Sequence, residues 1–393
     1  MTTLRVNDAA KIIYAHLSHI PISQVLNHAH GSKKPLISVH QDTTLDNVLS
    51  IMHTSQILAI PVYKVPKDEP DGKVFTGIVS VFDILANTVF QSVFDDMSGN
   101  VKNPITMSKD EFQQYIRMVK EEHAYFSTKI GELLGQTSES AESWTLHSSD
   151  PLTSLLQILT YANRHRALII DDDVNLATVA PPSGSSIRLV TQTDLLRYLL
   201  DTDCVVSTLN NDTSDCKESL QSALDTIWSI PVSNADRITL IQSADPQTLS
   251  STQLSETKKQ LVCVESSMSA LAALRSLYLH QVSAVAVVDT NGRLVANLSA
   301  SDLRGVNFSN LEMLLGSVFE FLEAEKRTPN QLKSDQLKSV EPGSVVGEVG
   351  VSMMEHMIHH LWVVDDDDHP IGVVSMSDVL ALFVPENGAA VEQ

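Results

Sequence analysis

The chain has 393 residues, of which 43% are hydrophobic and 19% are charged, and this length accommodates two or three domains with buried cores. No apolar stretch reaches the roughly 18 residues of a membrane-spanning helix, and the N-terminus lacks a basic head followed by an apolar run. We therefore expect a cytoplasmic protein, with the nucleus as a second location. The formal net charge of −21 disfavours nucleic acid and membrane as partners, because both require a basic surface.

The cysteines are Cys204, Cys216 and Cys263, an odd number without the spacing of metal ligands. Such cysteines are typical of a reducing compartment, and they disfavour a disulfide scaffold or a zinc site. We expect them to be reduced and structural.

The first half of the chain predicts an N-terminal helical segment, 1–34, followed by two units of one β-α-β-β-α pattern. The first unit spans 35–100, and its last helix opens near Asp83. The second unit spans 128–203, with a longer loop between its last two strands and a final helix that opens near Asp194.

The second half repeats the pattern. A linker rich in Ser, Thr and Asp, 204–257, contains a predicted helix at 217–228 and is a candidate docking segment for a partner. The third unit spans 258–325, where an Asn-Gly turn joins the two central strands. The fourth unit spans 335–386, and its run of four aspartates predicts a solvated turn.

Each unit ends its last strand in a Ser/Thr-x-x-Asp step that opens the following helix. One such step is an ordinary helix-start signature, because the hydroxyl and the carboxylate cap exposed backbone N–H groups. Four steps, each preceded by the same helix and strands, indicate an internal repeat. The steps run from Ser80 to Asp83, Thr191 to Asp194, Ser299 to Asp302 and Ser375 to Asp378.

Two of the steps have the full pattern Gly-h-h-Ser-x-x-Asp, where h is apolar, at Gly77–Asp83 and Gly372–Asp378. This pattern resembles the close of the CBS domain, named after cystathionine beta-synthase. Four repeats in two tandem pairs, from about Pro21 to Leu382, resemble the gamma regulatory subunit of the AMP-activated protein kinase family.

The resemblance implies an α/β fold of four β-α-β-β-α CBS repeats, arranged as two tandem CBS pairs (Bateman modules) in a pseudo-fourfold disc. It also implies AMP, ADP or ATP as the ligand, bound in clefts between repeats. The implied protein partners are the catalytic and scaffold subunits of a kinase.

A nucleotide in these clefts would meet the residues of each step. A carboxylate can accept two hydrogen bonds from vicinal ribose hydroxyls, and a hydroxyl at a helix N-terminus lies where backbone N–H groups favour phosphate. The ribose candidates are Asp83, Asp194, Asp302 and Asp378, and the hydroxyl candidates for phosphate are Ser80, Thr191, Ser299 and Ser375.

The positive charge for phosphate is expected just before the second strand, where three repeats of the gamma family carry His-Arg, Val-Ser and His-Arg. The equivalent pairs here are interpreted as His165–Arg166, Val282–Ser283 and His359–His360, and all of these residues except Val282 are phosphate candidates. The first repeat has Leu58–Ala59, which removes one expected contact, while the second keeps Asp194 where the gamma subunit typically lacks the aspartate. Because His titrates near neutral pH, we expect anion binding at His359 and His360 to tighten toward about pH 6.

The sequence contains no P-loop, no GxGxxG after a strand, no HExxH and no GxSxG motif, so we expect a regulatory protein rather than an enzyme. No cofactor or metal is expected, and His356, His359 and His360 are a weaker metal-binding alternative. A scaffold with degenerate sites, in phosphatase or stress signalling, is a second hypothesis. S-adenosylmethionine is a third ligand class, which the phosphate-directed Arg166 disfavours.

Overall fold

The computed structural model describes residues 5–29, 36–67, 72–90, 108, 110, 127–137, 140, 145–160, 164–170, 187–209, 214–238, 240, 261–305, 313–314, 316–325 and 339–386. It is a mixed α/β fold with four small sheets, which confirms the predicted fold class. None of the helices within these ranges combines the length and apolar character that crossing a membrane requires.

Each sheet has three strands in sequence order, the first parallel to the second and the second antiparallel to the third. Parallel neighbours need a crossover connection, which the first helix of each repeat supplies. The strands are β1 (Val39–His40), β2 (Ala59–Lys64), β3 (Val74–Ser80), β4 (Thr145–His147), β5 (Arg166–Ile170), β6 (Ile187–Thr191), β7 (Cys263–Glu265), β8 (Ala284–Val288), β9 (Leu294–Ser299), β10 (Ser339–Val340), β11 (His360–Val364) and β12 (Pro370–Ser375).

Two helices accompany each sheet, one at the crossover and one after the third strand. In chain order they are α3 (Leu45–Ser55), α4 (Val81–Phe90), α8 (Leu152–Thr160), α9 (Gln192–Leu200), α12 (Ala270–Leu279), η7 (Ala300–Gly305), α14 (Val346–His356) and α15 (Met376–Ala381). The helix expected to open at Asp302 is η7, a 3-10 helix, so the last element of repeat three differs from the prediction.

The other described helices precede, join or follow these units. They are α1 (Val6–Leu17), α2 (Ser23–Ala29), η3 (Ile130–Leu133), α10 (Thr202–Ser207), α11 (Ser214–Trp228), η5 (Val232–Asn234) and α13 (Val318–Glu325). The helix predicted within the linker is confirmed as α11, which begins three residues earlier than expected.

The sheets pack face to face in tandem pairs. One buried cluster joins the sheets of repeats one and two, and another joins those of repeats three and four. The first contains Ala59, Ile78, Leu168, Ile170 and Ile187, and the second contains Ala286, Leu294, Trp362 and Val364. This arrangement confirms the two tandem pairs, because each cluster draws its apolar residues from two consecutive sheets.

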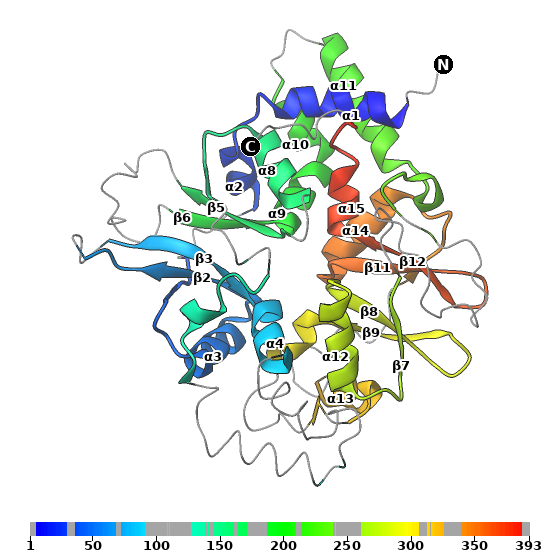
Figure 1. Cartoon of the computed structure of the whole chain (residues 1–393). Coiled ribbons are helices and arrows are strands. Elements are labelled where there is room, and N and C mark those ends of the chain that lie inside the picture. The colour runs from blue at the N-terminus through cyan, green and yellow to red at the C-terminus, as the bar shows by residue number, and fades with distance from the viewer. Residues whose placement is uncertain are drawn as a thin grey trace.

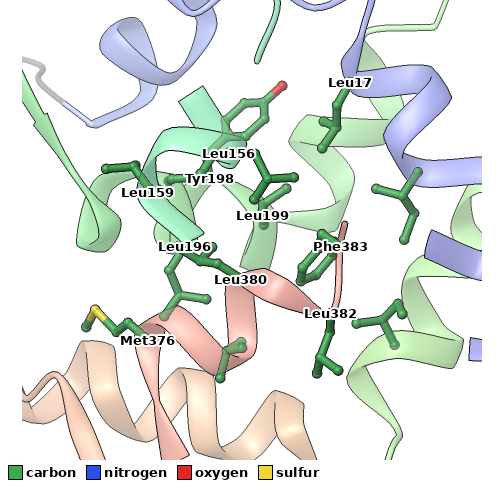
Figure 2. Packing of buried hydrophobic residues seen from close by; sticks show 14 of the residues in the cluster. Leu17, Leu156, Leu159, Leu196, Tyr198, Leu199, Met376, Leu380, Leu382 and Phe383 are labelled. Atoms are coloured by element: carbon green, nitrogen blue, oxygen red, sulfur yellow. The ribbon is translucent and has the colours of Figure 1, made fainter. Parts of the chain in front are cut away.

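The helices pack across the two pairs and close the molecule into a ring of four units (Figure 1). One core joins repeats one and three through residues such as Leu45 and Leu274. The other joins repeats two and four, and it also includes residues of α1, α2 and α11. Figure 2 shows this second core, where Leu196 and Leu199 of α9 lie in one apolar cluster with Leu380 of α15.

Segments from outside the sheets pair with the residue just before each crossover helix. The bridges are Pro21 with Pro151, Thr44 with Lys129, Ser269 with Ser317 and Pro231 with Val345. The bridge at Lys129 brings η3 onto repeat one, although its residues were expected to open repeat two. The connecting segments are therefore structural parts of the repeats that they contact.

Candidate functional site

The Ser/Thr-x-x-Asp steps form the same polar corner in all four repeats. In each corner the aspartate Oδ2 accepts hydrogen bonds from the backbone N–H and the hydroxyl of the Ser or Thr three residues earlier. The hydroxyl oxygens lie 2.7, 2.8, 3.0 and 2.6 Å from the Oδ2 atoms of Asp83, Asp194, Asp302 and Asp378. These bonds fix the strand-to-helix turn and place the carboxylates at equivalent positions.

The hydroxyls of Ser80, Thr191, Ser299 and Ser375 are thereby used inside the corners. A hydroxyl has one proton, and here that proton is donated to the carboxylate. In the corners of Ser80, Thr191 and Ser375, the same oxygen also accepts the aspartate N–H at 3.3 to 3.4 Å. In this structure these hydroxyls therefore act as helix caps, and their role as phosphate candidates stays a prediction.

The strand register identifies the residue opposite each cap. Arg166 pairs with Thr191 and His360 pairs with Ser375. Alanines take this place in the other two repeats, where Ala59 pairs with Ser80 and Ala284 pairs with Ser299. The basic positions predicted for repeats two and four are therefore strand neighbours of their corners.

The same register corrects the alignment of repeat three. In each repeat, the residue after the Ser or Thr cap donates its backbone N–H to the carbonyl of the residue that precedes the strand position opposite the cap. These carbonyls belong to Leu58, His165, Ser283 and His359. Ser283–Ala284 is therefore the equivalent pair, one residue later than the expected Val282–Ser283. Ser283 takes the place of His165, and alanine takes the place of Arg166.

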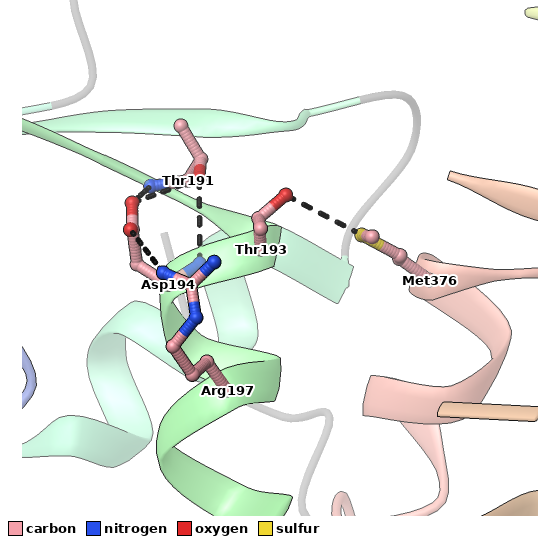
Figure 3. A network of polar contacts seen from close by, with 5 residues as sticks. All are labelled: Thr191, Thr193, Asp194, Arg197 and Met376. Atoms are coloured by element: carbon pink, nitrogen blue, oxygen red, sulfur yellow. Dashed lines mark hydrogen bonds and ion pairs between the residues drawn. The ribbon is translucent and has the colours of Figure 1, made fainter. Parts of the chain in front are cut away.

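The helix starts that follow the corners of repeats two and four contact each other, and Figure 3 shows Thr193 of repeat two beside Met376 of repeat four. Gln192 Nε2 donates to Ser377 Oγ at 2.8 Å, and Thr193 Oγ1 donates to Met376 Sδ at 3.7 Å. No sequence pattern indicated these residues, because their contacts join positions 185 and 183 residues apart.

Arg197 is a second cation at the corner of repeat two and was not among the predicted site residues. Its Nη1 lies 3.9 Å from Asp194 Oδ1, and its side chain is 39% exposed (Figure 3). The spacing of three residues on one helix was the signal that could have identified this pair.

His360 does not provide the expected charge near pH 6. Its Nε2 donates to Asn297 Oδ1 at 2.7 Å, and Trp362 Nε1 donates to the same oxygen at 3.0 Å. Burial, with a smaller effect from His359, lowers the pKa of His360 to about 4. The expectation that protonation of His360 tightens anion binding near pH 6 is therefore wrong, while the exposed His359 stays a phosphate candidate.

Asp83 is enclosed by the protein. Its side chain has no exposed surface, and its Oδ1 accepts a hydrogen bond from Thr137 Oγ1 at 2.6 Å. Burial raises the pKa of Asp83, although the hydrogen bonds from Thr137 and Ser80 act in the opposite direction. Both oxygens of this ribose candidate thus already have protein donors.

Within the described residues, one group combines side chains that could ligate a metal. A ring nitrogen of His28, a carboxylate oxygen of Asp201 and the sulfur of Cys204 all lie within 4.8 Å of one another. The carboxylate already has two partners, because Oδ1 accepts the N–H of Cys204 as a helix cap and Oδ2 lies 3.0 Å from His28. These bonds explain the group as a link between α2 and α10.

Three segments of the chain, 32–88, 254–307 and 331–384, match the model of the CBS domain family. These segments hold the corners of Asp83, Asp302 and Asp378. The remaining corner, at Asp194, lies outside the matched segments, but its sheet has the same strand order and register.

One of two similar proteins is named as a kinase subunit and the other as gamma-like. An SNF1-related protein kinase regulatory subunit gamma-like protein, PV42b of Arabidopsis thaliana, is 21% identical over 382 residues, which cover 89% of this chain and 91% of that protein. The 5'-AMP-activated protein kinase subunit gamma-3 of Sus scrofa is 30% identical over 132 residues, which cover 33% of this chain and 24% of that protein.

A solved structure also shares the architecture. It is a protein of Methanocaldococcus jannaschii, described as a candidate archaeal homologue of the AMPK gamma subunit. The TM-score is 0.54 at 17% identity, and the alignment covers 91% of this chain and 99% of that one. At this identity, the likeness concerns the fold alone.

Proposed function

Because this chain is a CBS-repeat protein that resembles the gamma regulatory subunits of the AMP-activated protein kinase family, we propose that it binds adenine nucleotides and reports their occupancy to a protein kinase. The coarser reading, a regulatory and nucleotide-sensing protein, follows from the CBS matches and the gamma-like relatives. AMP, ADP or ATP as the ligand and a kinase as the partner are the finer proposal.

The observation that carries this proposal is the pair of adjoining corners at Asp194 and Asp378. Each has a buried carboxylate fixed at the start of a helix, which suits two hydrogen bonds from vicinal ribose hydroxyls. At the corner of repeat two, Arg166 occupies the strand position opposite the cap, where a cation can meet a phosphate. Neighbouring strands supply apolar residues for a flat base.

The site would regulate by binding rather than by catalysis. The two tandem pairs meet through helices, and a nucleotide with different affinities for two arrangements of these pairs would shift the population between them. A partner that contacts one arrangement better would then respond to nucleotide concentration. No metal or cofactor is required for this role.

Calorimetric titration of the full chain with AMP, ADP and ATP tests the proposal. Asp194→Asn and Asp378→Asn keep an acceptor for the cap but lose the charge, and each should weaken binding about tenfold or more. Asp203→Asn, at an exposed aspartate outside the corners, is the matched control and should bind like the wild type. Binding that is indifferent to both corner variants would contradict the assigned sites.

A second function is a scaffold that acts by protein contact alone. The observation that favours it is the loss of the expected chemistry at two corners, since Asp83 is enclosed by Thr137 and repeat three has Ala284 in the basic position. An affinity pull-down with the wild type and a triple variant, Arg166→Ala with Asp194→Asn and Asp378→Asn, separates the two functions. Nucleotide-independent capture of the same partner by both proteins would support the scaffold.

A further inference from the structure

The segment after η3 covers the corner of repeat one. The described residues of this cover are Leu134, Gly135, Gln136, Thr137 and Ser140. A Cβ atom at Gly77 would lie 2.7 Å from Leu134 Cδ2 and 2.8 Å from the carbonyl oxygen of Ser140. The cover therefore packs against the backbone of β3 where a larger side chain would clash.

A hydroxyl of the cover reaches the ribose candidate directly. Thr137 Oγ1 donates to Asp83 Oδ1 at 2.6 Å, while Ser80 supplies both donors to Oδ2, at 2.8 Å from its N–H and 2.7 Å from its hydroxyl. Asp83 has no exposed surface. A ribose hydroxyl could reach Oδ1 in the same manner only if Thr137 moved away.

The cover is braced by its own hydrogen bonds. Ser140 Oγ accepts the N–H groups of Gly135 at 3.1 Å and Thr137 at 3.2 Å, and Ser140 also has no exposed surface. Before the cover, Ile130 and Leu133 of η3 are fully buried in the core shared by repeats one and three. The hydroxyl of Thr137 is thus held at the carboxylate by a packed turn.

We infer that Thr137 is an internal substitute for a ribose hydroxyl, and that the corner of repeat one is a latent ribonucleotide site held closed by the cover. This inference rests on the proposed function, because it assigns the same ligand class to the same type of corner. The register agrees with a closed site, since Ala59 stands opposite Ser80 where repeat two has Arg166. A site that no phosphate enters needs no cation.

The closure itself can be tested without nucleotide. Thr137→Ala removes the donor to Asp83, and hydrogen–deuterium exchange should become faster in β3 and at the start of α4. Thr160→Ala is the matched control, because its hydroxyl donates only to carbonyls of its own helix turn. Unchanged exchange at Ser80 to Asp83 in Thr137→Ala would overturn the closure.

The latent site is tested by the number of AMP molecules bound in calorimetry. We expect Asp83→Asn to leave the wild-type stoichiometry unchanged, Thr137→Ala to add one site, and Thr137→Ala with Asp83→Asn to remove that added site. A lower stoichiometry in Asp83→Asn alone would mean that the site is already open, and no added site in Thr137→Ala would mean that it does not accept AMP. Either result overturns the latent site.

Absence of AMP binding to the wild type and to every variant would contradict the proposed function as well. The hydrogen–deuterium exchange of Thr137→Ala would then be the remaining test of whether the cover closes the corner of repeat one.

Discussion

Gly77 illustrates how a single residue decides what can pack beside the corner of repeat one. Gly77→Ala would place a methyl group against Leu134 and the carbonyl of Ser140, so we expect a loss of about 1–3 kcal/mol in the free energy of unfolding. Gly343→Ala is the control, because nothing lies within 4 Å of its added Cβ, and we expect a change within about 0.5 kcal/mol. Urea denaturation of both variants measures the difference, and equal stabilities would contradict the close approach of the cover.

His360 makes a second prediction at the scale of a residue. Its pKa is about 4 in the folded protein and near 6.5 when unfolded, so the unfolded state binds the extra proton between these values. The contribution of neutral His360 to the free energy of unfolding is therefore complete above about pH 6.5. It is lost as the pH drops toward 4, and the loss is at most about 3 kcal/mol. His360→Gln should remove this loss, whereas His359→Gln, in which His360 remains, should keep it. Thermal unfolding at pH 7, 6, 5 and 4 measures it, and an identical acid profile for wild type and His360→Gln would refute the assignment.

Contacts that could be predicted from the sequence differ from those that could not in the separation of their residues along the chain. The bonds between Ser80 and Asp83 join neighbours on one turn, so a local pattern predicted them. Thr137 bonds Asp83 from 54 positions away, and Asn297 bonds His360 from 63 positions away. No periodicity or motif reports such distant contacts, which is why the closed site and the neutral histidine were not foreseen.

At the scale of secondary-structure elements, the caps of α9 and α15 contribute to stability apart from any ligand. Thr191 takes part in a capping box, so we expect Thr191→Ala to cost about 0.5–2 kcal/mol. Thr226→Ala is the matched control within α11, where the exposed hydroxyl donates to a carbonyl of its own helix, and we expect a change within about 0.5 kcal/mol. Chemical denaturation with helix content as the readout tests this, and a neutral Thr191→Ala would mean that the step is not needed to start the helix.

The sequence predicted the type of a secondary-structure element correctly where its pattern was strong. The prediction was wrong where contacts outside the pattern determine the type. Continuous apolar runs predicted the central strands, because both faces of these strands are covered. The step at Asp302 carries the same cap atoms as its three equivalents but opens a 3-10 helix. Ser299 Oγ there also lies 2.5 Å from Ser301 Oγ, a contact that a search for Ser-x-x-Asp does not consider.

At the scale of the whole molecule, one hydrophobic core contains the segment after α15 together with residues of repeat two and of α11. Phe383 has no exposed surface, and its ring centre lies 5.0 Å from that of Trp228 in α11. We expect Phe383→Ala to lower the free energy of unfolding by about 3–5 kcal/mol and to increase hydrogen exchange in α9 and α11. Phe319→Ala, at a side chain that is 48% exposed, is the control and should change little. Exchange that rises only within α15 would argue against a shared core.

Nucleotide binding at the corners of repeats two and four is tested most directly by calorimetric titration of the wild-type chain with AMP, ADP and ATP, repeated on Asp194→Asn and Asp378→Asn. We expect the three nucleotides to compete for binding, and each substitution to weaken binding about tenfold or more. No heat of binding from any of the three nucleotides at millimolar concentration would contradict nucleotide binding at these corners.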